Sequence, residues 1–118
     1  ILVLPLESKI QIFNSELMKQ IELANVKTCR QWIADNVQPL ENPRIDLDKA
    51  LIRKILRSSI DSGELKSDTP EEEFANFIIS TLYGLMINWC MTDTKFEPLE
   101  HIDTVSDFIL SSLKPYRN

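Results

Sequence analysis

Apolar residues recur at intervals of three and four along most of this 118-residue chain, and no other feature constrains its fold as strongly. This spacing places apolar side chains along one face of an α-helix, so that each segment can bury that face in a common core. The chain also holds only two glycines, which argues against β architectures built on many tight turns. We therefore expect an all-α antiparallel bundle of about five helices, with no strand.

The apolar stripes, and the residues that interrupt them, place the expected helices along the chain. Pro39 and Pro43 end the second helix, because proline cannot continue a helix from within. We expect the connection over residues 37–45 to be the most mobile loop. Asp46 is the expected N-cap of the third helix. The predicted helices cover residues 6–24, 26–37, 46–60, 70–91 and 99–113.

The turn between the third and fourth helices carries the clearest local signals. Gly63 lies where a helix end needs left-handed backbone, and Leu65 can fold back on the last turn. Thr69 is then the expected N-cap of the fourth helix, with Pro70 at its first position. The three glutamates at 71–73 suit the positive end of the helix dipole, and the second of them completes a capping box. We interpret this acidic run as a helix start rather than a metal site.

The fourth helix is apolar on more than one side. Gly84 lies in its middle, where glycine costs about 1 kcal/mol relative to alanine, and close approach of another helix is the usual reason for such a residue. Together with the apolar fifth helix, this helix carries more apolar surface than one small core requires, so we expect a homodimer through the last two helices. The predicted interface residues are Phe77, Thr81, Gly84, Asn88, Val105, Phe108 and Ser112.

Charge and cysteine content exclude several classes of function. The formal net charge is -5 at pH 7, and a surface of that sign repels phosphate, so this part of the protein should not itself bind nucleic acid. Cys29 and Cys90 do not follow zinc-site spacing, and we expect buried free thiols in a reducing cytoplasm. No apolar run approaches the roughly 20 residues that span a bilayer, so no membrane contact is expected.

The sequence offers no enzyme constellation, and we predict no catalytic residue, no metal and no other cofactor. Two glycines in the whole chain exclude Gly-rich phosphate-binding loops. A nucleophilic triad would have to use His101, the only histidine, which lies in a charged segment at the start of the fifth helix. We therefore interpret His101 as a surface or interface residue. The carboxylates lie at helix starts and loops, where capping and solubility account for them.

Large, adaptable side chains lie on several of the amphipathic helices. Aromatic and methionine residues line apolar ligand pockets, but they equally fill ordinary cores, and the sequence leaves both interpretations open. Few charges accompany these side chains, so a molecule bound among them would be apolar or aromatic. The candidate ligand-binding residues are Phe13, Leu17, Cys29, Trp32, Leu56, Met86 and Trp89.

A basic series on the third helix has two interpretations. Lys49, Arg53 and Arg57 follow one another at four-residue intervals and therefore lie on one face of the helix. They form either a solvated surface or a contact to an acidic partner.

Several segments resemble the C-terminal domain of TetR-family transcriptional regulators. Residues 50–52, 59–70, 82–85 and 88–97 follow the family's order of a G-E-L turn, a Y-G-L helix and a W-x-x-x-D-x-x-F-D loop before a final amphipathic helix. Residues 29–33 are similar to the second helix of one subgroup. Glu97 stands where the family often has Asp. The matched residues are caps and packing positions, and the resemblance is closer after residue 50 than before it.

The resemblance implies that residues 1–118 form an effector-binding and dimerisation domain with a small molecule bound between its helices. An N-terminal helix-turn-helix, which we expect upstream of this sequence, would read the operator. Effector binding would shift the first helix and change the separation of the two recognition helices, which must match about one DNA turn. Effectors differ among members of the family, so the resemblance does not indicate which effector this chain binds. The alternative is a helical protein-interaction (adaptor) module that docks another helix and binds no small molecule.

Overall fold

The computed structural model describes residues 2–23, 31, 34, 43–92 and 98–118. These residues form α-helices and short 3-10 turns with one isolated bridge between residues 65 and 117, which confirms the all-α fold class. The predicted second helix falls largely outside the described residues, so a fifth α-helix stays a prediction. The elements are α1 (Leu6–Leu23), α3 (Pro43–Asp61), α4 (Glu71–Thr92), η1 (Pro98–His101), α5 (Ile102–Leu113) and η2 (Lys114–Tyr116).

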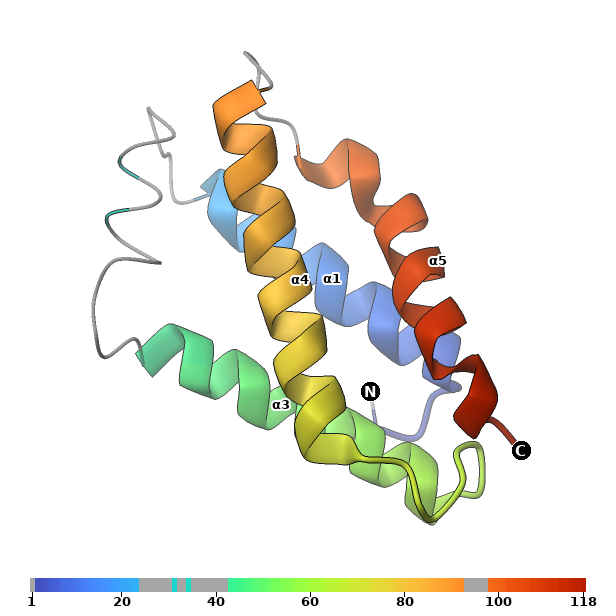
Figure 1. Cartoon of the computed structure of the whole chain (residues 1–118). Helices are drawn as coiled ribbons and strands as arrows, with labels where there is room; N and C mark the ends of the chain where they lie inside the picture. The colour runs from blue at the N-terminus through green and yellow to red at the C-terminus, as the bar shows by residue number, and fades with distance from the viewer. Residues whose placement is uncertain (1, 24–30, 32–33, 35–42, 93–97) are drawn as a thin grey trace.

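The helices pack as two pairs that share one core. α3 lies against α4, α1 lies against α5, and α1 also contacts α3. Figure 1 shows α4 and α5 both in front of α1, while the start of α1, the end of the chain and the turn between α3 and α4 gather at one end of the bundle. This arrangement leaves the outer faces of α4 and α5 on the same side of the molecule.

The apolar stripe of the first helix reaches the core. Leu6, Ile10, Phe13 and Leu17 are each at most 4% exposed, as expected for residues spaced by three and four. α3, α4 and α5 contribute to the same apolar cluster. Its other buried members include Met18, Ile52, Ile55, Leu56, Ile78, Leu82, Met86, Val105, Ile109 and Leu113.

The turn after α3 follows the sequence prediction closely. Gly63 has φ 86°, the left-handed conformation that a helix end of this type requires. Its N–H donates to the carbonyl of Ile60 at 3.1 Å, and the N–H of Leu65 donates to the carbonyl of Ser59 at 3.0 Å. Leu65 is 1% exposed. The predicted fold-back of Leu65 onto the end of the helix is therefore confirmed.

The predicted start of the third helix was wrong. α3 begins at Pro43, so Asp46 lies within its first turn and is not the N-cap. The ring of proline fixes φ near the helical value, and a residue at the first helical position needs no N–H partner, so Pro43 starts the helix instead of marking a loop. Residues 43–45 are consequently helical rather than part of the predicted mobile connection.

The starts of the last two α-helices also differ from prediction, whereas α1 begins at Leu6 as predicted. α4 begins at Glu71, and the N–H of Phe74 donates to the carbonyl of Pro70 at 3.0 Å. The hydroxyl of Thr69 donates to the carbonyl of Lys66 at 2.6 Å and closes the preceding turn. The last α-helix begins at Ile102 rather than near residue 99, because a 3-10 turn precedes it. Such differences are common at helix ends, where 3-10 geometry often replaces the first or last α-turn.

Candidate functional site

The structure brings five of the seven predicted ligand-binding residues into one region. Phe13, Leu17, Leu56 and Met86 are buried members of the same apolar cluster, although they come from three different helices. Trp89 is partly buried and packs against that cluster. The two remaining candidates, Cys29 and Trp32, lie outside the described residues. The contribution of this region to ligand binding remains a prediction.

Trp89 makes a ring contact that the sequence did not indicate. Its indole stacks on the imidazole of His101, with ring centroids 4.2 Å apart and planes inclined by 21°. His101 ends the 3-10 turn that precedes α5, so the stack joins the C-terminal part of α4 to the start of α5. His101 is thus partly buried beside the apolar cluster.

A polar pair lies inside the bundle between α1 and α5. Asn14 is 0% exposed and Ser106 is 4% exposed, and the side-chain Nδ2 of Asn14 donates to the Ser106 hydroxyl at 3.0 Å. The carbonyl oxygen Oδ1 of Asn14 is also buried, and it has no hydrogen-bond partner among the described residues. Sequence reasoning missed this pair, although the position of Asn14 next to Phe13 within an apolar stripe was an available signal.

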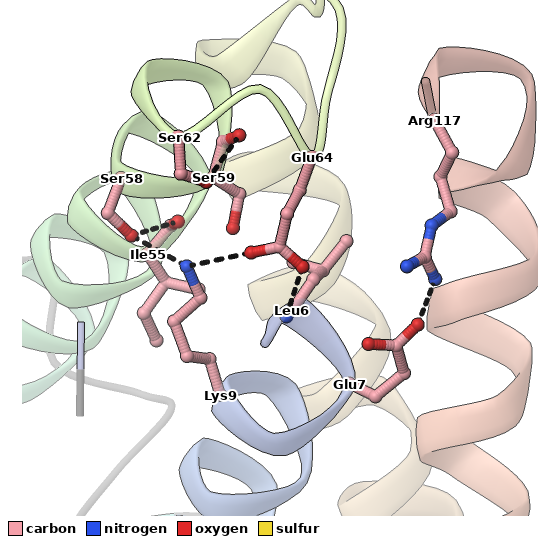
Figure 2. Close-up of polar contacts among 9 residues, drawn as sticks. All are labelled: Leu6, Glu7, Lys9, Ile55, Ser58, Ser59, Ser62, Glu64 and Arg117. Atoms are coloured by element: carbon pink, nitrogen blue, oxygen red, sulfur yellow. Dashed lines mark hydrogen bonds and ion pairs between the residues drawn. The ribbon is translucent and has the colours of Figure 1, made fainter. Parts of the chain in front are cut away.

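A second buried polar group fixes the first turn of α1 (Figure 2). Lys9 is 1% exposed, and its Nζ donates to the Ser58 hydroxyl at 2.8 Å and lies 3.8 Å from Oε1 of Glu64. The other oxygen of Glu64 accepts the backbone N–H of Leu6 at 2.8 Å. Burial lowers the pKa of Lys9, and the nearby Glu64 carboxylate partly offsets this change.

The C-terminal tail joins the same region. The backbone N–H of Lys66 donates to the carbonyl of Tyr116 at 2.7 Å, and the guanidinium of Arg117 pairs with Glu7. The hydrogen bond from Arg117 holds the pKa of Glu7 below its usual value. We call these three segments, residues 6–9, 62–66 and 114–118, the polar anchor. They bind the start of α1 to the α3–α4 turn and to the end of the chain.

Two members of the basic series on α3, Arg53 and Arg57, form ion pairs within the chain. Arg53 lies 2.8 Å from Glu72, and Arg57 lies 2.6 Å from Glu71 and 3.8 Å from Asp61. Both arginines line a shallow surface groove of about 510 Å³. The acidic start of α4 therefore supplies the partners for these arginines, and nothing in this arrangement requires an acidic partner molecule.

The predicted interface residues fall into three environments. Phe77 and Phe108 are 47% and 65% exposed, and Gly84 and Asn88 are also exposed. Thr81 and Ser112 are half-buried, with the Ser112 hydroxyl donating to the carbonyl of Ile109 at 2.6 Å. Val105 lies in the core at 2% exposed.

An aromatic series links Phe77 to the end of the chain. Phe77 meets Phe74 edge-on at 6.5 Å between ring centroids, and Phe74 meets Tyr116 edge-on at 5.4 Å. Because Tyr116 follows α5, the series places Phe77 toward the α5 side of α4.

The described residues hold neither a metal-binding cluster nor a helix able to span a membrane. In these parts of the chain, no three histidine, cysteine, aspartate or glutamate side chains gather closely enough to hold a metal ion. No helix within residues 2–23, 43–92 and 98–118 has both the length and the apolar character needed to cross a membrane.

Comparison with known proteins identifies the class to which this architecture belongs. Residues 17–112 match the TetR_C_4 family, described as the C-terminal region of YsiA-like proteins. The match covers most of the chain, from the second half of α1 to the end of α5. No curated protein and no solved structure gave a significant match. The chain belongs to the TetR-family C-terminal regulatory domains, which confirms the resemblance noted in its sequence.

Proposed function

We propose that this chain is the effector-binding and dimerisation domain of a cytoplasmic TetR-type transcriptional repressor. In the intact protein, an N-terminal helix-turn-helix binds the operator and this domain controls its affinity. The family match over residues 17–112 is the observation that carries the proposal. The net charge of -5 is consistent with DNA contacts lying outside this domain.

The effector site lies among the apolar side chains that α1, α3 and α4 direct into the core. Phe13, Leu17, Leu56 and Met86 supply apolar walls, and Trp89 borders them. Methionine side chains adapt their shape at low cost, which suits a site that opens around a guest. We expect an effector with a mainly apolar or aromatic body.

The dimer forms through the outer faces of α4 and α5. Phe77 and Phe108 offer large exposed apolar side chains there. Gly84 is further evidence for an interface on this face. A Cβ at this position would meet nothing within 4 Å among the described residues. Packing inside this part of the chain therefore does not require a glycine at mid-helix. Close approach of a helix from a second copy of the chain would explain why a glycine stands at this mid-helix position.

The polar anchor gives α1 a means of transmitting the effector signal. Lys9 and Leu6 bind the first turn of α1 to Glu64, in the loop that follows α3. An effector that displaces α1 therefore moves the α3–α4 turn with it, instead of letting the helix slide alone. In the intact dimer this displacement would change the spacing of the two recognition helices.

Native mass spectrometry of the purified domain, followed by operator-binding assays on the intact protein, tests this function. We expect the domain to retain a small apolar molecule, and we expect that molecule to weaken operator binding by at least about tenfold. A domain that retains no small molecule, and whose tryptophan fluorescence responds to no apolar compound class, would contradict effector binding. Such a domain would instead fit a module that docks other helices.

A further inference from the structure

The buried amide of Asn14 is the least satisfied polar side chain on the core face of α1. It is 0% exposed, and only its Nδ2 has a partner, the Ser106 hydroxyl at 3.0 Å. Its Oδ1 is shielded from solvent and accepts no hydrogen bond from any described residue. Burying a carbonyl oxygen without a donor costs free energy, because the oxygen gives up its hydrogen bonds to water.

The missing partner does not depend on how the amide is oriented. Exchanging Nδ2 and Oδ1 would let the Ser106 hydroxyl donate to Oδ1, but it would leave Nδ2 without an acceptor. In either orientation Ser106 of α5 holds one end of the amide, and the other end has no hydrogen-bond partner among the described residues. Within the described residues the fold therefore leaves one hydrogen-bonding atom of this buried amide available for a partner.

The position of Asn14 connects it to the proposed effector site. Asn14 follows Phe13 directly and precedes Leu17 by three residues, so it shares the buried face of α1 with two of the candidate wall residues. Met18, four residues after Asn14, is also 0% exposed on that face. Asn14 therefore adds a hydrogen-bonding group to an otherwise apolar surface.

We propose that Asn14 is the polar contact of the effector site, and that its free Oδ1 accepts a hydrogen bond from a hydroxyl or N–H group on an otherwise apolar effector. This inference rests on the proposed function and narrows it to a class of compound. Apolar pockets commonly fix a ligand's orientation through a few such polar groups. A site built to pair with a ligand hydroxyl discriminates against an analogue that lacks it.

Matched pairs of small probes test the proposal. Each pair replaces a hydroxyl by a methyl group of similar size: 2-naphthol with 2-methylnaphthalene, and 4-butylphenol with 4-butyltoluene. Equilibrium dialysis gives the ratio of the two Kd values for the wild type, for Asn14→Leu and for the control Ile10→Leu. The control changes a buried apolar side chain of the same helix face without removing a hydrogen-bonding group.

We expect Asn14→Leu to shift the ratio by about tenfold toward the methyl compound, the size of one lost hydrogen bond, while Ile10→Leu leaves the ratio unchanged. An unchanged ratio in Asn14→Leu would overturn the role of Asn14 and leave the ligand-binding core intact. Failure of all four probes to bind the wild type would contradict the proposed effector site, and this inference with it. If Asn14→Leu does not fold, Asn14→Ala gives the same comparison.

Discussion

Lys9 and Glu64 form a nearly buried ion pair that joins the first turn of α1 to the loop after α3, with 3.8 Å between Nζ and Oε1. The two residues differ in environment, since the Lys9 side chain is 1% exposed and the Glu64 side chain is 26% exposed. Removing one partner of such a pair leaves the other charge uncompensated, and the cost depends on how far that charge is buried.

Glu64→Gln should therefore destabilise the domain more than Lys9→Met. The first change leaves a buried ammonium without its counter-charge and should lower the free energy of unfolding by about 2 kcal/mol. The second leaves a carboxylate that reaches water and should cost less than about 1 kcal/mol. Urea unfolding measures both. The exposed pair of Lys19 and Glu16, 3.9 Å apart, provides the control Glu16→Gln, which should change stability by less than about 0.5 kcal/mol. Equal losses in Glu64→Gln and Lys9→Met would contradict this asymmetry.

Glu7→Gln tests the contact between α1 and the C-terminal tail through its pH dependence. The hydrogen bond from Arg117 lowers the pKa of Glu7 below the usual 4.5. Because the folded-state pKa lies below the unfolded-state pKa, the pair stabilises the domain above about pH 4.5 and loses this effect as the pH falls through the folded-state value. The side chain of Glu7 is 49% exposed, so the effect should stay below about 1 kcal/mol. Thermal unfolding should show a lower Tm for Glu7→Gln near pH 7 and equal Tm values near pH 3. A difference in Tm between the wild type and Glu7→Gln that persists near pH 3 would show that the effect does not come from the ionised Glu7 side chain.

Gly63→Ala should destabilise the domain through backbone strain alone. A Cβ at this position would meet no described atom within 4 Å, but φ is +86°, a conformation that costs most L-residues about 1 kcal/mol. Gly63→Asn should lose less, because asparagine tolerates the left-handed region. Denaturant unfolding of the two variants gives the comparison. Wild-type stability in Gly63→Ala would show that the turn relaxes to another conformation.

Gly84→Leu should have opposite effects on folding and on association. Within the chain a Cβ at this exposed helical position meets no described atom within 4 Å, so a better helix former should raise the intrinsic stability of the subunit by up to about 1 kcal/mol. The added side chain should obstruct a second copy and weaken the dimer. Unfolding and sedimentation measured on the same sample separate the two effects. An unchanged mass together with raised stability would remove Gly84 from the interface.

Local sequence signals predicted the helices well where one residue decides the outcome. Gly63 ended a helix because only glycine adopts the required φ at little cost, and the α1 stripe was buried because its spacing matches the helical period. The start of α3 at Pro43 was missed because proline favours both a loop and a first helical turn. Interactions with other parts of the chain decide whether such a proline lies in a loop or starts a helix.

Polar contacts between distant segments could not be derived in this way. Asn14 and Ser106 are 92 residues apart in sequence, and the pairing of Lys9 with Ser58 and Glu64 depends on how α1 crosses α3. The partners of these polar groups depend on how the helices pack together. The apolar pattern limits the possible packings but does not determine which one forms. The predicted ligand-binding residues were named from side-chain type alone. That criterion selected four residues that lie in the described core, Phe13, Leu17, Leu56 and Met86, and it overlooked the amide beside them.

Sedimentation equilibrium of the wild-type domain at micromolar concentration tests most directly whether a second copy covers the outer faces of α4 and α5. We expect a single species with twice the 13.7 kDa mass of the chain, and partial dissociation in Gly84→Leu. A wild-type domain that sediments as a single 13.7 kDa chain throughout this range would contradict the dimer.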